Sequence, residues 1–350
     1  MLLISPTAQY IRWCYQSNHG RLFSEFAPGR PLPADFLAYL DRADTVAYRL
    51  PHGGPYVQET AKLVDSDVLA TIHRCADFLP LLNLPLVSMA DKCIARRPDA
   101  VHVVLCDTAI FSELPLPSRT YGLPYELLQE GVRRYGADGI CFQWMYDAIT
   151  ASPEHQLRHW IGVHLDEESS LSAFVNNHPI DTSAGFSFVG GVPGLHSCGD
   201  IDPAIPMLLM DAGDAGHLLA SDSGLQTLVS HPIEFSDILA GTDPEVAAAR
   251  DVLEHNLALY LGGMFAALGK VETVVFTSSI LEAALPLVYA LCKRLAFAGV
   301  QYQPALPGQH ERVIDLTGCE SEVQILAVNF DPWRAMSVLA EPLLKKDFRA

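Results

Sequence analysis

The sequence predicts an α/β fold with two domains. Short apolar runs of strand length alternate with longer segments in which apolar residues recur at helical spacing, and this alternation is typical of α/β proteins. The chain has 350 residues, which is enough for two domains that each bury a core. Apolar residues make up 49% of the chain and charged residues 18%, a balance typical of a folded globular protein rather than a disordered one.

The first third of the chain contains three candidate strands. Leu2–Ser5, Thr45–Leu50 and Val101–Asp107 are apolar runs of strand length. Arg21–Asp35 is rich in proline, glycine and polar residues, so we predict a loop there. Thr60–Leu82 carries apolar residues at helical spacing and is predicted to be a helix.

The rest of the chain continues the alternation. Trp160–Leu165 and Leu171–Asn176 flank an acidic turn and predict a β-hairpin. Asp243 followed by Pro244 predicts a helix start, because Asp caps free backbone amides and proline is tolerated in the first turn; this helix should end near Leu268. The remaining predicted elements are a strand, a helix and a strand over Val271–Thr277, Glu282–Phe297 and Val323–Asn329.

Charge and cysteine content exclude several classes of protein. The formal net charge is −18, and such a surface repels nucleic acid and anionic membranes, so neither is expected as a partner. The eight cysteines form no Cys-x-x-Cys pair and no short metal-ligand spacing, which predicts free thiols in a reducing cytoplasm and no metal site. The first residues lack a signal-peptide pattern, and no run of 18 apolar residues occurs. We therefore expect a cytoplasmic protein without a transmembrane helix.

Several motifs, in order along the chain, resemble the acetate kinase family. Asp181-Thr-Ser-Ala-Gly-Phe-Ser and Gly199-Asp-Ile-Asp-Pro-Ala-Ile are similar to a family signature. Tyr48-Arg-Leu-Pro-His-Gly-Gly and Cys106-Asp-Thr-Ala are similar to two further family motifs, and Tyr260-Leu-Gly-Gly begins a stretch similar to the helix before the family's nucleotide loop. The resemblance implies transfer of a phosphoryl group between ATP and a short carboxylate, with magnesium.

The same resemblance implies two ribonuclease H-like domains of the actin and sugar-kinase type, with an interdomain cleft. Residues 1–110 and 333–350 would form the first domain, shortened relative to the family, and residues 111–332 the second. It also implies a homodimer formed through the second domain. The apolar stretches Leu257–Leu268 and Ala283–Leu291 favour a homodimer, although a position in the core would explain them equally well.

Four residues match positions at which the family carries its chemistry. Arg49 corresponds to a carboxylate-binding arginine, whose guanidinium can hold a carboxylate through two parallel bonds; a structural ion pair is the alternative. His52 lies in the same motif and is predicted, with Arg49, to bind substrate. Asp107 corresponds to the catalytic aspartate, with helix capping as the alternative, and Asp138 replaces a histidine as the second candidate catalytic residue.

The loops that resemble the family's phosphate-binding segments have changed in composition. In the first loop, from Ser5 to Arg12, a proline removes one amide donor, and Arg12 keeps a cation at the loop end. In the next loop Asp166, Glu167 and Glu168 occupy positions that include two family glycines. Three acids repel a polyanion and add side chains where backbone amides must approach phosphate.

Two more segments depart from the family. Ser197 takes the place of an arginine, with His196 beside it as an alternative cation, and Ser279 and Leu281 replace residues of a glycine-rich adenosine loop. These changes favour a degenerate, pseudokinase-like member with a binding or regulatory role, in which ATP and magnesium binding is weak or absent. The alternative is a divergent phosphotransferase acting on a small carboxylate or acyl phosphate. The third hypothesis is ordinary ATP-dependent acetate kinase activity, which similarity alone would assign and which these changes rank last. Clustered carboxylates also suit a divalent cation or an amine, with solvated surface acids as the alternative.

Overall fold

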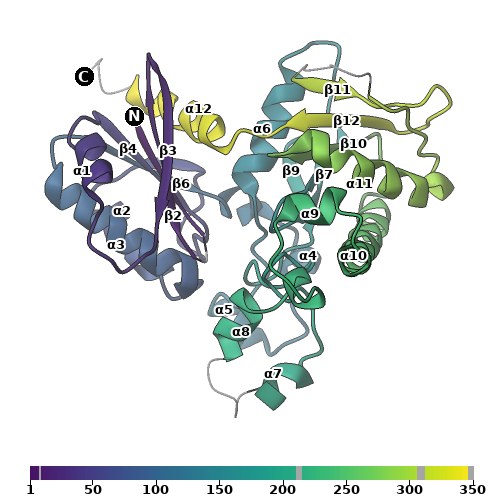
Figure 1. Ribbon diagram of the computed structural model, residues 1–350, viewed down its shortest axis with the longest axis horizontal. Helices are drawn as coiled ribbons and strands as arrows, with labels where there is room; N and C mark the ends of the chain where they lie inside the picture. The colour runs from purple at the N-terminus through teal and green to yellow at the C-terminus, as the bar shows by residue number, and fades with distance from the viewer. Residues whose placement is uncertain (8, 210–214, 306–311, 346–350) are drawn as a thin grey trace. The chain divides into compact units, whose positions relative to one another are not determined.

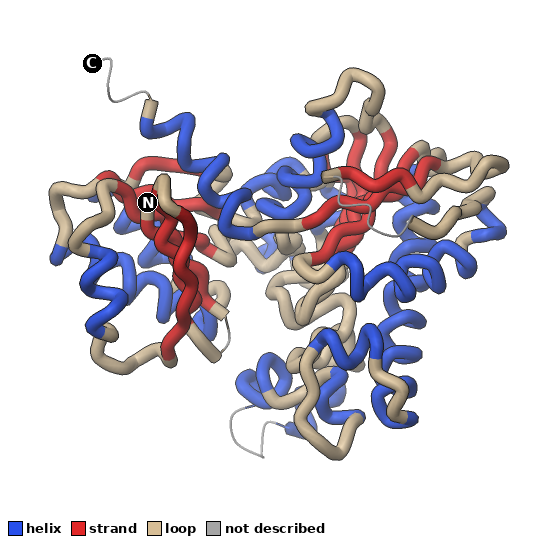
Figure 2. The backbone as a smooth tube through the Cα atoms, turned by 45° about the horizontal axis from the view of Figure 1, so that its top comes forward, coloured by secondary structure: helices blue, strands red, loops and turns tan. Residues whose placement is uncertain are grey.

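The computed structural model describes residues 1–7, 9–209, 215–305 and 312–345 (Figure 1). The chain divides into two compact units. The first unit comprises Met1–Ser112, Asp138–Ile140 and the described chain from Asp331 onward. The second comprises Glu113–Ala137 and the described residues of Cys141–Phe330. Each unit is built on one mixed six-stranded sheet with helices (Figure 2), which confirms the predicted α/β fold.

The sheet of the first unit has the strand order β3-β2-β1-β4-β6-β5. β1, β4 and β6 run parallel, while β2, β3 and β5 are each antiparallel to the strands that they pair with. The strands are Leu2–Pro6 (β1), Ile11–Ser17 (β2), Gly20–Phe26 (β3), Thr45–Leu50 (β4), Ala61–Leu63 (β5) and Val101–Cys106 (β6). The three strands predicted for this region, which correspond to β1, β4 and β6, are confirmed.

The helices of the first unit are Ala34–Leu40 (α1), Ser66–Cys75 (α2), Pro80–Arg96 (α3) and Pro332–Leu344 (α12). α3 packs on β1 and β4, and α12 packs on β1, β4, β5 and β6. β1 is buried over its whole length, as expected of a strand in the middle of a covered sheet.

Two predictions for the first unit are wrong. Arg21–Asp35, predicted to be a loop, begins inside β3, an edge strand whose polar and exposed residues hide the strand signal. Thr60–Leu82, predicted to be one helix, contains β5, α2 and the start of α3. Asp65 starts a new helix because its side chain accepts a hydrogen bond from the Val68 amide at 2.8 Å.

The sheet of the second unit has the order β11-β12-β10-β7-β8-β9. β7, β10 and β12 run parallel, and β8, β9 and β11 are antiparallel to their neighbours. The strands are His159–His164 (β7), Ser170–Val175 (β8), His178–Thr182 (β9), Thr273–Ser278 (β10), Val313–Asp315 (β11) and Gln324–Asn329 (β12). The predicted hairpin is β7–β8, and the predicted strands near Val274 and Ile325 are β10 and β12.

Two long helices cover this sheet. Pro244–Leu268 (α10) begins at Asp243, which accepts the Glu245 amide at 2.8 Å, and ends at Gly269, whose φ is 71°, as predicted. Leu281–Arg294 (α11) ends before the predicted Phe297, and a 3-10 turn then leads to Gly299. The other helices are α4 (Leu116–Arg119), α5 (Tyr125–Gln129), α6 (Gly139–Thr150, which starts in the first unit), α7 (Ala204–Leu209), α8 (Ala215–Ser221) and α9 (Phe235–Ala240).

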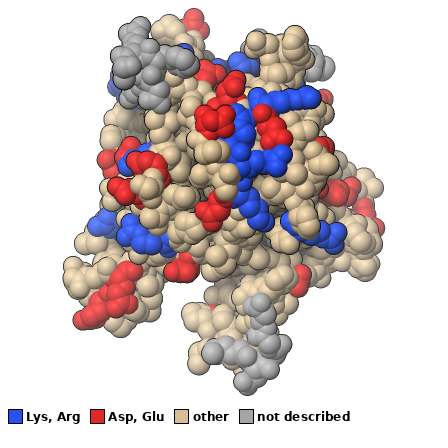
Figure 3. Space-filling view, turned by 90° about the vertical axis from the view of Figure 1, so that its left-hand side faces the viewer, with Lys and Arg blue, Asp and Glu red and all other residues tan. Residues whose placement is uncertain are grey.

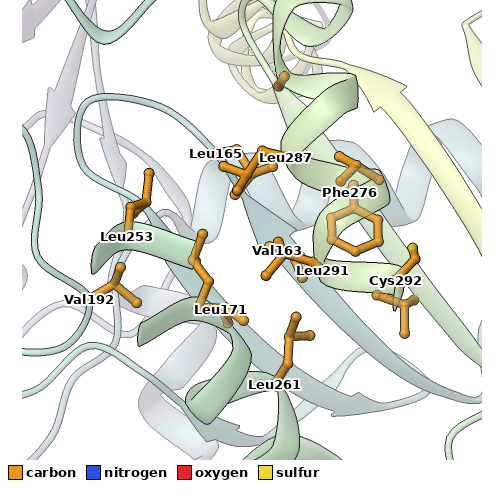
Figure 4. Close-up of a cluster of buried hydrophobic side chains, with 14 of the residues drawn as sticks. Val163, Leu165, Leu171, Val192, Leu253, Leu261, Phe276, Leu287, Leu291 and Cys292 are labelled. Carbon is orange, nitrogen blue, oxygen red and sulfur yellow. The ribbon is translucent and has the colours of Figure 1, made fainter. Parts of the chain in front are cut away.

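The apolar faces of α10 and α11 form the core of the second unit (Figure 4). Leu253 and Leu261 of α10 lie among side chains from β7, β8, β10 and α11. Because the buried residues of α10 recur every three or four positions, one face of the helix is turned to the core. A position in the core therefore explains the buried residues of the apolar stretches Leu257–Leu268 and Ala283–Leu291, whereas Leu259 is 63% exposed.

Charges of both signs are interspersed on the surface. Arg96 at the end of α3 contacts both carboxylate oxygens of Asp41 at 2.6 and 2.7 Å, and Arg97 pairs with Asp99 at 2.9 Å. Figure 3 shows basic and acidic side chains next to each other on one face of the molecule. Within the described ranges, no helix is both long enough and apolar enough to span a membrane.

Candidate functional site

In the first unit Arg49 lies between two carboxylates. β4 and β6 are parallel neighbours, with Leu50 opposite Cys106, so Arg49 near the end of β4 and Asp107 just after β6 meet at one sheet edge. Arg49 Nε donates to Asp107 Oδ2 at 2.5 Å, and its Nη2 donates to Asp138 Oδ1 at 3.3 Å. Asp107 and Asp138, both predicted site residues, therefore contact a third predicted site residue, Arg49. The ion pair proposed as the alternative role of Arg49 is present.

Asp107 also anchors the start of α6. Its Oδ1 accepts the Ile140 amide at 3.3 Å, and its carbonyl oxygen accepts the Gly139 amide at 3.1 Å. A Cβ added at Gly139 would lie 2.1 Å from that carbonyl, so only glycine allows this approach. Burial raises the pKa of Asp107, Arg49 lowers it and the charge of Asp138 raises it, with a net shift upward. Helix capping, the alternative role of Asp107, is thus observed as well.

Asp138 has an unusual backbone conformation. Its φ is 57°, in the left-handed region that few residues other than glycine, Asn and Asp adopt. Its backbone precedes α6 at this angle, and its side chain is largely buried beside Arg49. Two carboxylates and one guanidinium give this cluster a net charge of about −1 when all three are ionised.

His52, predicted to bind substrate, is fully buried. Its Nδ1 accepts the Gly54 amide at 3.0 Å, and Asn83 bonds both its backbone amide, at 3.3 Å, and its carbonyl oxygen, at 2.8 Å. The ring stacks on Phe78 with centroids 5.6 Å apart. These contacts fix the turn after β4 and give His52 a structural role, which sequence reasoning did not foresee.

Ser5 and Arg12 face each other across the β1–β2 hairpin. Ser5 is buried near the end of β1, and Arg12 Nε donates to Glu25 Oε2 of β3 at 3.1 Å. The described part of the segment predicted to be a phosphate loop therefore belongs to the β1–β2 hairpin, in which the Thr7 amide also donates to the Tyr10 carbonyl at 2.7 Å. The cation that the sequence analysis assigned to this loop pairs with an acid of the same sheet.

In the second unit Asp166 accepts hydrogen bonds from two separate segments. His164 Nε2 lies 2.9 Å from its Oδ2, while the Ser279 hydroxyl donates to Oδ1 at 2.6 Å and the Ser279 amide to Oδ2 at 3.2 Å. Burial raises the pKa of Asp166, but the bonds from His164 and Ser279 outweigh it, so the pKa is lowered. Asp166 thereby joins the β7–β8 loop to the turn between β10 and α11.

Glu168 and Ser197 form a second contact between loops. The Ser197 hydroxyl is buried and donates to Glu168 Oε2 at 2.5 Å. A Cβ on Gly194 would lie 2.2 Å from Glu168 Oε2, so the carboxylate lies directly over that glycine. Glu168 and Ser197 are therefore hydrogen-bond partners. The sequence analysis treated them as two separate departures from the family.

Glu167 and Leu281 are the remaining residues of these loops. Glu167 is partly buried, and its carbonyl oxygen accepts the Leu195 amide at 2.7 Å. Leu281, in the segment similar to the family's adenosine loop, is 2% exposed and belongs to the core, because α11 begins there and turns the side chain inward. Among the described residues, no group of three or more His, Cys, Asp or Glu side chains is arranged to hold a metal ion.

The two signature segments that carried the resemblance have structural contacts. Asp181 Oδ1 accepts Arg134 Nη1 at 2.9 Å. Asp200 accepts the Gly191 amide at 2.8 Å and also the hydroxyl of Tyr260 on α10. These bonds fix the long connection between β9 and α7. His164 is a site residue that the sequence analysis missed, and its position two residues before Asp166 was the available signal.

Comparison with known proteins identifies the family of the chain. The model of the acetokinase family matches residues 34–331. Acetate kinase from Thermosynechococcus vestitus is 31% identical over 82% of this chain and 71% of its own length, and that from Acaryochloris marina is 31% identical over 85% and 76%. Among solved structures, a propionate kinase from Francisella tularensis superposes with a TM-score of 0.83 at 20% identity, over 97% of this chain and 98% of that one. Acetate kinase from Entamoeba histolytica superposes with a TM-score of 0.81 at 21% identity, over 96% and 97%.

Proposed function

Because the chain belongs to the acetokinase family, we propose that it is a divergent member that binds a small carboxylate or acyl phosphate in a binding or regulatory role and does not hold ATP tightly. One observation carries this proposal. The β7–β8 loop directs its acids at the surrounding donors, with Asp166 accepting the Ser279 amide and hydroxyl and Glu168 accepting the Ser197 hydroxyl.

Electrostatics support weak nucleotide binding. At an effective dielectric constant of ~20, two like charges ~4 Å apart repel by about 4 kcal/mol before screening. One unrelieved contact of this size corresponds to roughly three decades of affinity. The segment from Asp166 to Glu168 places three acids in succession, so a polyphosphate that approaches it meets both the repulsion and donors that are already engaged.

Thermal unfolding with millimolar Mg-ATP, Mg²⁺ alone, acetate and acetyl phosphate tests the proposal. A ligand present at 100 times its dissociation constant stabilises the folded state by about 2.7 kcal/mol. We expect a shift with acetate or acetyl phosphate and none with Mg-ATP beyond the effect of Mg²⁺. A clear additional shift with Mg-ATP contradicts the proposal.

A second candidate function is a phosphotransferase that acts on a small carboxylate or acyl phosphate. The contact between Arg49 and Asp107 at 2.5 Å favours it, because a guanidinium beside a carboxylate at a strand end is a common arrangement for orienting a substrate. Incubation with acetyl phosphate and a panel of nucleoside diphosphates, followed by detection of nucleoside triphosphate, separates the two. Turnover that is lost in Arg49→Lys supports the enzyme.

We also propose a cytoplasmic homodimer formed through the second unit. Tyr125 of α5 and Met207 and Leu208 of α7 are 65%, 71% and 79% exposed, and exposed apolar side chains often mark subunit contacts. Buried free thiols such as Cys93 and Cys106 suit a reducing compartment. Light scattering at micromolar concentration should give about twice the chain mass of 38.2 kDa; a mass near that of one chain contradicts the dimer.

A further inference from the structure

The second unit contains a three-residue segment whose carboxylates collect hydrogen bonds from distant parts of the chain. Asp166 and Glu168 are two positions apart in the β7–β8 loop. Asp166 takes the amide and hydroxyl of Ser279, 113 residues away, and Glu168 takes the hydroxyl of Ser197, 29 residues away. His164 adds a contact to Asp166 at 2.9 Å. Amide, hydroxyl and imidazole groups are donors that also bind oxyanions.

We propose that Asp166 and Glu168 form an autoinhibitory clasp, in which the protein's own carboxylates occupy donors that otherwise hold a phosphate-class anion. The clasp joins the β7–β8 loop to the turn before α11 through Asp166 and to the loop around Gly194 through Glu168. This inference concerns the loops on which the proposed function depends, and it rests on that proposed function.

Tethering explains why such a clasp is effective. Because the carboxylates belong to the same chain as the donors, their effective concentration at the donors is high. An external anion must therefore compete with a tethered group. Each carboxylate also repels an approaching anion. The clasp therefore blocks anions both by occupying the donors and by its charge.

Space at Gly194 supports the same conclusion. Both carboxylate oxygens of Glu168 lie within 2.2 to 2.5 Å of the position of a Cβ on Gly194. The absence of a side chain at this glycine leaves room for the Glu168 carboxylate, although Glu168 as a whole residue is exposed. Truncation of Glu168 thus opens both a donor, the Ser197 hydroxyl, and the space beside it.

The test compares Asp166→Ala/Glu168→Ala with its parent. Calorimetry measures binding of inorganic phosphate and pyrophosphate, and hydrogen exchange reports the amides of residues 165–170 and 279–283 without ligand. We expect phosphate or pyrophosphate affinity to rise at least tenfold, and exchange in these two segments to accelerate while β10 and β12 stay protected. The control, Asp251→Ala/Glu320→Ala, removes two exposed acids of the same unit and tests the effect of net charge alone.

Two further variants keep the test decisive. Asp166→Asn preserves the size of the side chain and replaces the double variant if that variant does not fold, with the same direction expected for both readouts. Ser279→Ala breaks the clasp but also removes a donor, so it should accelerate exchange without a gain in anion affinity.

The clasp is overturned if the double variant binds anions no better than the control, or if exchange in both segments is unchanged. Tight Mg-ATP binding by the unaltered protein contradicts the proposed function instead. The two failures are distinguishable because the clasp is judged only by the difference between each variant and its parent.

Discussion

Asp107 in the first unit and Asp166 in the second are both carboxylates withdrawn from solvent just beyond the end of a parallel strand, yet their surroundings act in opposite directions. Asp107 is fully buried, and its main partner is the Arg49 guanidinium at 2.5 Å, with the charge of Asp138 nearby. Asp166 keeps 21% of its side chain exposed and is held by His164 and Ser279. Accordingly the pKa of Asp107 is raised and that of Asp166 is lowered.

The difference shows that a carboxylate stabilised by a counter-charge and a carboxylate stabilised by hydrogen-bond donors are sensitive to different changes. In the first unit one cation serves two acids, so the cluster depends on a balance of charge. In the second unit hydrogen-bond donors from several segments serve one acid, so the contact depends on the relative position of loops. Loss of a partner should therefore be severe in the first unit and graded in the second.

Replacement of Arg49 by methionine should have the largest effect. The variant leaves Asp107 buried without its counter-charge and close to Asp138, and removal of one partner of a buried pair typically costs about 3 to 5 kcal/mol. Urea unfolding of the parent and of Arg49→Met measures the change in unfolding free energy.

The matched control for Arg49 is Arg12→Met. Arg12 also pairs with an acid of the same sheet, but Arg12 and Glu25 are 43% and 46% exposed, so the loss should stay below about 1 kcal/mol. Equal losses in the two variants would show that burial of Asp107 does not set the cost.

Asp166→Asn should cost less, and its cost should depend on pH. Bonds to a charged acceptor contribute about 1.5 to 3 kcal/mol in total here at neutral pH. The pKa of Asp166 lies below its ordinary value of 3.8, so the unfolded chain binds the proton more tightly than the folded one. The contribution is therefore complete above that value and is lost as the pH falls through the folded pKa. Denaturant unfolding at several pH values should show parent and variant converging in acid.

Asp107→Asn should show the opposite pH dependence. The folded pKa of Asp107 is raised above 3.8, so the folded chain binds the proton more tightly, and the parent gains stability relative to the variant as the pH falls through the folded pKa toward 3.8. The same unfolding series measures both variants. Parallel curves for Asp107→Asn and Asp166→Asn would contradict the contrast between the two carboxylates.

Much of the architecture is readable from local signals. The capping Asp243 and the terminal Gly269 bound α10 as predicted, and the apolar runs at β4 and β10 have strand length. Elements without such signals were missed. β3 is an edge strand with little burial, and β5 has three residues, so neither carries enough apolar pattern to be distinguished from loop or helix.

For the sites, the sequence predicted which residues belong together in the first unit but not their partners in the second. Arg49 and Asp107 lie at the ends of neighbouring parallel strands, and strand order brings them together. The contacts of Asp166 with Ser279 and of Glu168 with Ser197 depend on how loops pack. No periodicity in the sequence encodes the distances between these loops. The sequence alone therefore predicted that the two acids are isolated, repulsive charges.

Asp138 offers a smaller effect within the first unit. Its φ of 57° is tolerated by Asp and Asn because their short polar side chains bond locally. Asp138→Ala adds strain to the loss of the Arg49 contact, whereas Asp138→Asn loses only charge. We expect Ala to be less stable than Asn by about 1 kcal/mol in urea unfolding. Asp138→Gly should relieve the backbone strain without restoring the contact with Arg49, so it should be more stable than Asp138→Ala. A glycine variant no more stable than the alanine variant would show that strain at a φ of 57° does not lower stability.

Ser197→Ala should have the smallest effect and should be coupled to Glu168. The buried Ser197 hydroxyl donates to the carboxylate of Glu168, an exposed residue, so loss of the bond should cost about 0.5 to 1.5 kcal/mol. In Glu168→Gln the neutral amide oxygen accepts the bond less strongly, so the serine change should cost less in that background. A double-mutant cycle by urea unfolding measures this coupling. Additive losses would show that Ser197 and Glu168 stabilise the loop independently of each other. The stability of the second unit would then depend on single charges, as in the first unit, and not on a contact between two loops.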